Sequence, residues 1–325
     1  MEQKAFADKS RMRDSGVELL KVIAVILIVI SHVVLTLTTE NEYIPYNNYL
    51  LDCTHATTSG TVLLLAVMRH FGALGNWIFF VASAWFLLDS TKASGKKIMG
   101  MLLDIWVISV LFLGITLLIR GEVSGKLFLF SLFPTTFENN WYLTCYLLFY
   151  PIHPYLNRLI SAMTQKEHLK MISVLTVLYI GFNFIESRFF FPNMLLLWIS
   201  VYLILAYIKR YCIELYSNTK VNGILLLCGA AGAVGIVILT DLLGLKIAVL
   251  SDQLLRWVSN FNPFLILIAI AAFGLARNNH LKNKTVNQIA KCSMLIYIIH
   301  ENILLRTYTR PYLWHCIFNR YGCQR

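Results

Sequence analysis

The chain has 325 residues, of which 58% are hydrophobic and only 14% are charged, and its mean hydropathy is +0.64. Soluble domains are about a quarter charged, so this composition excludes an ordinary soluble protein and indicates an integral membrane protein. The net charge of +11 does not indicate nucleic-acid binding, because basic residues of membrane proteins collect in cytoplasmic loops. The seven cysteines contain no Cys-x-x-Cys pair, so we expect neither a disulfide framework nor a metal site.

The first apolar run, residues 17–38, is a predicted transmembrane helix that carries two ionisable side chains, Lys21 and His32. Their eleven-residue spacing is about three turns, which places both on one face, roughly 16 Å apart along the axis. Ionisable groups in hydrocarbon are costly, so helices that keep them usually use them. His32 is a candidate general base, or alternatively a packing histidine. Lys21 is a candidate phosphate anchor, or a lysine that snorkels to the interface, and Glu18 is a potential partner for it.

The rest of the chain contains further apolar runs of the length that a bilayer requires, which predicts about nine to ten spans in total. We expect the run 57–68 to be a re-entrant or interfacial helix that leads into the second span. We also expect Pro151 and Pro154 to break the fourth span near its cytoplasmic end. The segment after residue 305 is too short to cross comfortably. The later spans are predicted at 72–88, 98–119, 140–160, 171–186, 193–208, 222–243, 261–276 and 286–305.

Basic residues predict how the chain is oriented in the membrane. Five basic clusters fall on one side of the bilayer if the N-terminus is cytoplasmic, whereas the loop 39–59 is acidic and has no Lys or Arg. His32 then lies in the outer half of the first span, and Lys21 lies near its cytoplasmic end. We find no soluble domain and no obvious internal repeat. The sequence thus predicts an all-α polytopic helical bundle over 1–325, as one integral-membrane domain.

Three further segments carry side chains with potential roles. In the second span, Ser83 lies among small residues that equally suit close helix packing. Arg69 and His70, just before it, would line an outer mouth or mark an interface. In the fourth span, Trp141 begins an aromatic pair that also suits an interfacial belt. In the last run, Tyr297, His300 and Glu301 fall on about one helical face. They are candidates for a functional role, or alternatively form a polar cluster at the membrane interface.

These segments, taken in order, resemble acyltransferase family 3, whose members are integral-membrane acyltransferases. The resemblance extends over nearly the whole chain, and the form of the late motif looks like that of members found in bacterial capsule and exopolysaccharide gene clusters. In the family, the first helix carries a basic residue, then ten residues, then an essential histidine, and three later motifs follow. The matching residues are Lys21, His32, Phe79, Phe80, Ser83, Trp141, Tyr142, Leu143, Pro154, Leu156, Asn157, Ser293, Tyr297, His300, Glu301 and Asn302.

The resemblance implies transfer of an acetyl or other short acyl group from acyl-CoA to a carbohydrate hydroxyl. Acetyl-CoA would be a donor substrate, no cofactor would be bound permanently, and the acceptor would be a polysaccharide or lipid-linked glycan. The location implied is the bacterial inner membrane. Lys21 would hold the coenzyme A phosphates and His32 would activate the sugar hydroxyl. Arg158, Lys96 and Lys97 would offer further phosphate contacts.

The sequence departs from the family pattern at three places. Lys21 replaces the usual arginine, which keeps the charge but loses bidentate phosphate contact. Ala84 replaces the usual glycine, and most members have a further span after the Tyr-x-x-His motif. Two alternatives stay open: a transporter or flippase for a lipid-linked sugar, which would also need polar groups within the membrane, and an inactive truncated relative of the family.

Overall fold

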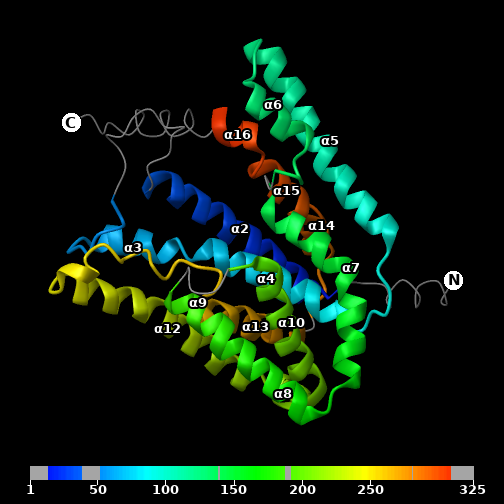
Figure 1. The fold of residues 1–325 in the computed structure, drawn as a ribbon, viewed down its shortest axis with the longest axis vertical. Helices are drawn as coiled ribbons and strands as arrows, with labels where there is room; N and C mark the ends of the chain where they lie inside the picture. The colour runs from blue at the N-terminus through cyan, green and yellow to red at the C-terminus, as the bar shows by residue number, and fades with distance from the viewer. Residues whose placement is uncertain (1–13, 39–51, 138–139, 187–191, 280, 309–325) are drawn as a thin grey trace. The chain divides into compact units, whose positions relative to one another are not determined.

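The computed structural model describes residues 14–38, 52–137, 140–186, 192–279 and 281–308, and these residues form helices and no strand. This confirms the predicted all-α class. The described residues form two compact units. Of the described residues, unit 1 holds those in 14–38, 52–90 and 155–293, and unit 2 holds those in 91–154 and 294–308; Figure 1 labels the helices.

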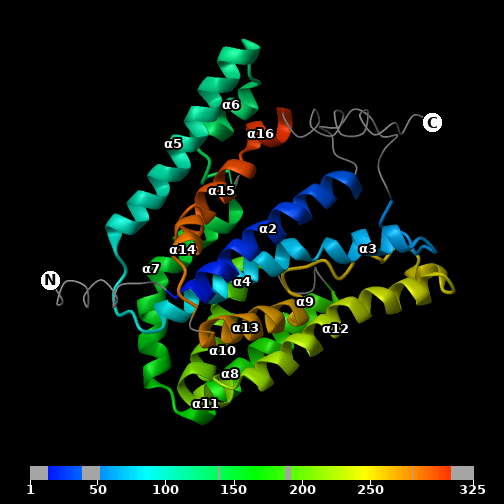
Figure 2. The ribbon, with the colours of Figure 1, turned by 180° about the vertical axis from the view of Figure 1, so that it is seen from behind.

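Unit 1 is a bundle in which α2 packs along α4 and α12 packs along α13 (Figure 2). Its elements are α2 (Ser15–Thr38), α3 (Gly60–Met68), α4 (Phe71–Leu87), α8 (Gln165–Val174), the π-helix η2 (Leu175–Gly181), α9 (Phe182–Ile185), α10 (Met194–Tyr211), α11 (Ile213–Tyr216), α12 (Thr219–Gly244), the short 3₁₀ turn η3 (Ala248–Leu250), α13 (Pro263–Asn278) and α14 (Lys284–Lys291).

Glycines on α4 allow α2 to approach it closely. A Cβ atom at Gly75 would lie 2.6 Å from the carbonyl oxygen of Ala24 and 2.6 Å from Cγ1 of Ile28. A Cβ atom at Gly72 would lie 2.7 Å from the Ser31 hydroxyl. Small residues at helix contacts are typical of membrane bundles, where close packing replaces the hydrophobic effect. The α2 segment from Ala24 to Ser31 is therefore held against α4.

The beginning of α2 is fixed by polar contacts to the region around α13 and α14. The Ser15 hydroxyl accepts a hydrogen bond from Asn283 N at 2.8 Å, and Ser15 N donates to Leu281 O at 3.0 Å. A Cβ atom at Gly16 would lie 2.3 Å from Ala276 O. These contacts satisfy orphan N–H groups that every helix start exposes, and they place the start of α2 beside the end of α13.

Unit 2 contains α5 (Gly95–Arg120), α6 (Gly125–Leu132), α15 (Ser293–His300) except its first residue, and α16 (Ile303–Tyr308). Helix α7 (Trp141–Ala162) begins in unit 2 and ends in unit 1. A small apolar core of Leu113, Leu127 and Leu304 joins α5, α6 and α16. The sequence-distant helix α16 is thereby packed against the α5–α6 hairpin.

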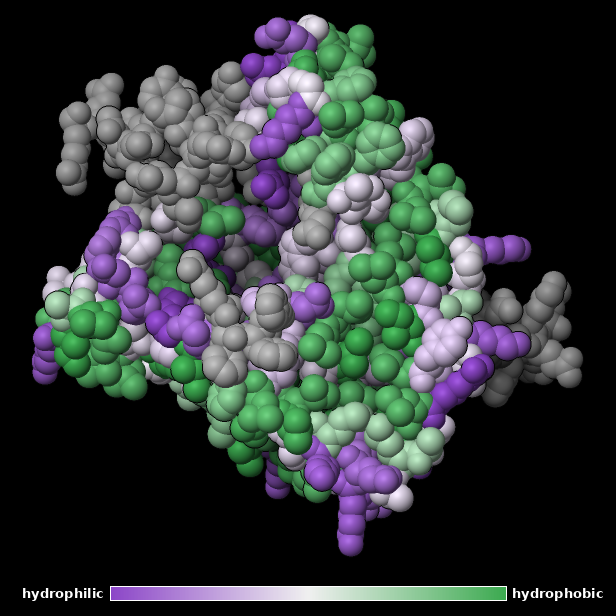
Figure 3. Space-filling view, viewed as in Figure 1, coloured by the Kyte–Doolittle hydropathy of each residue, from purple (hydrophilic) through white to green (hydrophobic). Residues whose placement is uncertain are grey.

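Six helical segments of the described residues are long and apolar enough to cross a membrane. They correspond to six of the predicted spans: the first three, the fifth, the sixth and the seventh. Large apolar side chains lie exposed on them, as at Leu118 and Ile119 of α5, which are 87% and 78% exposed. Broad hydrophobic areas cover the face turned to the viewer (Figure 3). Such a surface requires a lipid environment.

The run 57–68 contains helix α3, which leads into the second span, α4. The C-cap of α3, Arg69, and the N-cap of α4, His70, both have right-handed helical dihedral angles. Residues 60–87 together make one apolar segment of 28 residues, which is long enough to cross a membrane.

The predicted break at the prolines of the fourth span is also wrong, because α7 runs through both Pro151 and Pro154. Pro154 has no N–H to donate to the carbonyl oxygen of Tyr150, four residues earlier. The His153 ring occupies that place, since its Nδ1 bonds to Tyr150 O. A neighbouring side chain thus satisfies the carbonyl that the proline leaves open, and the helix continues.

The last predicted span, 286–305, is not one helix but parts of three: α14, α15 and α16. Helix α14 ends at Lys291, and the N–H of its C-cap residue, Cys292, bonds to Ile289 O in a tight turn. After α15, the Asn302 side chain accepts from Leu304 N at 3.1 Å and so begins α16. An asparagine at this position competes with helix continuation by bonding to the backbone, which explains the break.

Candidate active site

The two residues that the sequence singled out on the first helix lie on one face of α2. Between them on that face, at positions four and seven residues after Lys21, are Val25 and Ile28, which are 5% and 1% exposed. Lys21 and His32 are each partly buried. This face is therefore turned into the protein, where a cation and an imidazole can meet a ligand and not only lipid.

Lys21 has a carboxylate partner one turn earlier on the same helix. Its Nζ lies 2.8 Å from Glu18 Oε1, which confirms the pairing that the i, i+3 spacing predicted. Glu18 is buried, at 6% exposed. The Lys21 charge is thus stabilised inside the protein before any ligand arrives, and a bound phosphate would share the ammonium group with this carboxylate.

The residue before His32 links α2 to the junction between α3 and α4. The Ser31 hydroxyl donates a hydrogen bond to Arg69 O at 3.2 Å, and the buried His70 ring bonds through Nδ1 to Ala66 O at 3.3 Å. Arg69 and His70 therefore lie in the interior of the segment 60–87, against the part of α2 that carries His32.

The motif on α4 serves packing at most of its positions. Phe80 is fully buried, with its ring centroid 5.7 Å from that of Trp77 and 4.5 Å from that of Trp198. Ala84 is fully buried as well. Ser83, one turn after Phe79 and Phe80, is partly buried and is the one hydroxyl of this motif.

In unit 2, residues from the fourth and last predicted spans form one cluster. Trp141 stacks edge-on against Tyr142, and the Tyr142 ring centroid lies 5.9 Å from that of Tyr297. The Tyr297 ring in turn lies 5.7 Å from the His300 ring. Two motifs that are about 150 residues apart in the sequence thus meet in one aromatic cluster.

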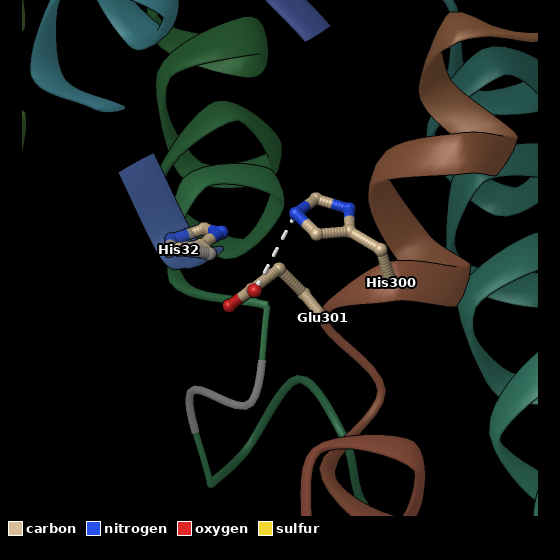
Figure 4. Close-up of side chains that lie close together, drawn as sticks. All are labelled: His32, His300 and Glu301. Atoms are coloured by element: carbon tan, nitrogen blue, oxygen red, sulfur yellow. Dashed lines mark ion pairs between the residues drawn. The ribbon is translucent and has the colours of Figure 1, made fainter. Parts of the chain in front are cut away.

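The polar end of this cluster is an ion-pair chain just beyond α15. His300 Nε2 lies 3.5 Å from Glu301 Oε1, and Figure 4 marks this pair with a dashed line. Glu301 is 5% exposed, and its other oxygen lies 3.4 Å from Arg306 Nη1. The sequence reasoning missed Arg306, which carried no signal except its charge at the end of an apolar run. His32 belongs to unit 1, and His300 and Glu301 belong to unit 2.

Asn157 of the fourth-span motif and two of the three further basic candidates, Lys97 and Arg158, make structural contacts. Asn157 donates to Leu87 O at 2.9 Å and to Ser90 O at 2.8 Å, and so caps the end of α4. Lys97 lies over the Tyr150 ring, 4.6 Å from its centroid, in unit 2. Arg158 lies over the Tyr155 ring at 5.7 Å, in unit 1. Lys96 is exposed in the first turn of α5.

Among the described residues, six apolar segments are long enough to cross a membrane, and polar groups lie buried within the helices, which indicates an integral-membrane protein with a candidate active site. The family model for the acyltransferase domain Acyl_transf_3 matches residues 14–319. The chain therefore belongs to acyltransferase family 3 and is a multi-pass membrane acyltransferase. Comparisons with curated proteins and with solved structures found no match.

Proposed function

We propose that this membrane acyltransferase moves an acetyl or other short acyl group from acyl-CoA to a carbohydrate hydroxyl. The acceptor is a surface polysaccharide or its lipid-linked precursor, and the protein lies in the bacterial inner membrane with its N-terminus in the cytoplasm. One observation carries the proposal: Lys21 and His32 share an inward face of α2, with the buried Val25 and Ile28 between them. A cation and a base at this spacing suit a long donor with a charged head and a reactive end.

The chemistry assigns the proton transfer to His32. Its imidazole removes the proton from the sugar hydroxyl while the oxygen attacks the thioester carbonyl carbon. The carbon–sulfur bond then breaks, the acyl group is left as an ester on the sugar, and the imidazolium returns the proton to the departing thiolate. No other co-reactant is needed, because the thioester supplies the acyl group in activated form.

Lys21 binds the phosphates of acyl-CoA at the cytoplasmic end of the same helix. Its separation from His32, roughly 16 Å of helix rise, is bridged by the pantetheine arm. Ser83, Trp141, Tyr297, His300 and Glu301 are proposed as further site residues, with Ser83 on α4 and the other four in the unit 2 cluster.

The test compares glycan O-acetyl content by NMR in a deletion strain and in the same strain complemented with the wild-type gene. Complementation is expected to restore O-acetyl signals, and the purified protein is expected to bind acetyl-CoA. Equal O-acetyl content in both strains would overturn the proposed acceptor. Accumulation of a lipid-linked sugar without any need for acetyl-CoA would favour the transporter alternative.

A further inference from the structure

A cavity of about 410 Å³ lies in unit 1 where three helices end, at the C-terminal ends of α4, α7 and α10. This volume falls within the range of sites that bind small molecules. The lining combines two cations, one carboxylate, two neutral polar groups and three apolar side chains. The lining residues are Leu88, Asp89, Asn157, Ile160, Ser161, Ala206, Lys209 and Arg210.

Hydrogen bonds hold the walls of this cavity in place. Lys209 Nζ donates to Trp85 O at 3.0 Å and to Asp89 Oδ2 at 2.6 Å. Arg210 Nη1 donates to Ile160 O at 2.7 Å. Trp85 O and Ile160 O lie in the last turns of α4 and α7, so both cations lie where the partial negative charge of a helix C-terminus favours them.

The Arg210 side chain has donors beyond the one that Ile160 O receives. A guanidinium group carries five N–H donors in a planar fork, a geometry that matches phosphate oxygens. Asp89 is 71% exposed on its side chain and offers acceptors for hydroxyl or amino groups. Leu88, Ile160 and Ala206 supply apolar wall, so the lining suits a ligand with an anionic group, polar donors and a flat apolar part.

This cavity lies at the end of unit 1 where α2 begins, as a series of contacts shows. Ala276 at the end of α13 meets Gly16, and the adjacent Arg277 lies over the Trp85 ring, 5.2 Å from its centroid. Lys209 of the cavity lies over the same ring at 5.1 Å. The cavity is thus at the basic end of the bundle, the end from which the Lys21–His32 face of α2 extends.

We propose that this cavity binds the phosphoryl-bearing nucleotide end of acyl-CoA, an inference that rests on the proposed function. Arg210 pairs with the ribose phosphate, Asp89 accepts from a hydroxyl or amino group of the nucleoside, and the apolar wall contacts the base. A phospholipid headgroup would offer the same phosphoryl chemistry, so the experiment must separate the two sources.

The experiment measures binding of coenzyme A and of 3′-dephospho-coenzyme A to the purified full chain by calorimetry. Arg210→Ala is expected to weaken coenzyme A binding by about tenfold or more, because a charge-assisted hydrogen bond is lost. Binding of the dephospho form is expected to change much less. Lys220→Ala, which removes an exposed cation in the first turn of α12, is the matched control and should leave both affinities unchanged.

Because Arg210 also bonds to Ile160 O, a second variant tests the cavity without removing that contact. Ser161 is exposed on the cavity wall, and Ser161→Phe fills the space while all the lining charges remain. We expect this variant to weaken coenzyme A binding as well, with its melting temperature close to that of the wild type.

The outcomes separate this inference from the proposed function and from a lipid site. If the wild type binds coenzyme A and both variants bind it equally well, the cavity is not the nucleotide site, although acyl-CoA remains the donor. If the wild type does not bind coenzyme A, the donor proposal itself fails. The lipid alternative is tested by comparing melting temperatures in nanodiscs that contain phosphatidylethanolamine and in nanodiscs of phosphatidylcholine alone. If the variants lose only the extra stability that phosphatidylethanolamine gives the wild type, the phosphoryl group comes from lipid and the inference is overturned.

Discussion

Lys21 Nζ lies 2.8 Å from Glu18 Oε1 on α2, and Glu18 is 6% exposed. A lysine that only snorkelled to the interface would have no need of a buried carboxylate. The pair keeps a cation at a fixed place on the inward face of α2. A phosphate that binds there meets an ammonium group that is already positioned, and the phosphate shares this ammonium group with the Glu18 carboxylate.

Lys21→Glu is expected to raise the KM for acyl-CoA by about tenfold or more, because one charge-assisted contact is lost and two like charges then face each other. The kcat should change less, since His32 remains. Steady-state kinetics with acetyl-CoA as the varied substrate measure both constants. Lys21→Arg keeps the charge and is the control, with a KM near or below the wild-type value. An unchanged KM in Lys21→Glu would remove Lys21 from donor binding.

His153→Ala is expected to lower the free energy of unfolding by about 1–3 kcal/mol, because Tyr150 O then loses its hydrogen bond inside the protein. Thermal or denaturant unfolding of the purified protein in detergent measures this loss. The loss of unfolding free energy should be largest when residue 154 is proline, because proline has no N–H to donate to Tyr150 O.

The Pro154→Ala background makes that prediction specific. Alanine at 154 restores the N–H that can bond to Tyr150 O along the helix. In this background, His153→Ala should cost clearly less than it does in the wild type. Equal costs in the two backgrounds would show that the His153 ring does not compensate for the proline.

The loop at residues 52–57 gives a pH prediction outside the membrane-spanning segments. The pKa of the Asp52 carboxyl is held below its usual value of 3.8, chiefly because the Thr54 hydroxyl donates to it. A carboxyl with a lowered pKa in the folded state stabilises the fold above its unfolded-state pKa and loses that effect as pH falls through the folded-state pKa. The same loop is bound to the α12–α13 connection through Ala56 N and Ser251 O at 2.6 Å.

Asp52→Asn is therefore expected to lower the melting temperature at neutral pH and to have little effect once the pH is well below 3.8. Melting curves of wild type and variant across this pH range give the difference directly. If the difference in melting temperature between wild type and variant stayed constant down to the lowest pH, the charge of Asp52 would not contribute to stability.

The long helices could be predicted from the sequence because apolar length alone determines them in a bilayer. The runs that became α2, α5, α10 and α12 needed no tertiary information. The failures came where side chains decide the backbone locally. Asn302 caps α16 and interrupts the last run, whereas the His153 ring lets α7 continue through a proline. Each outcome depends on a single hydrogen bond, and a hydropathy profile gives no information about such bonds.

The candidate site was predictable at the level of single helices. The helical period placed Lys21 and His32 on one face, and the i, i+3 spacing predicted the Glu18 partner. The meeting of Tyr142 with Tyr297 required the tertiary fold, as did the bond between Glu301 and Arg306. Lys209 and Arg210 looked like a generic loop cluster, because nothing in the sequence places Asp89 or Asn157 beside them.

His32 is the proposed base, and its removal should act on the rate and not on folding or donor binding. In purified His32→Ala, we expect acetyl transfer from acetyl-CoA to the glycan to fall by about 10²–10⁴-fold, the usual contribution of a general base. The melting temperature and the affinity for coenzyme A should stay close to the wild-type values. His55→Ala, at an exposed histidine of the 52–57 loop, is the control and should keep full activity. Full transfer activity in well-folded His32→Ala would contradict the mechanism.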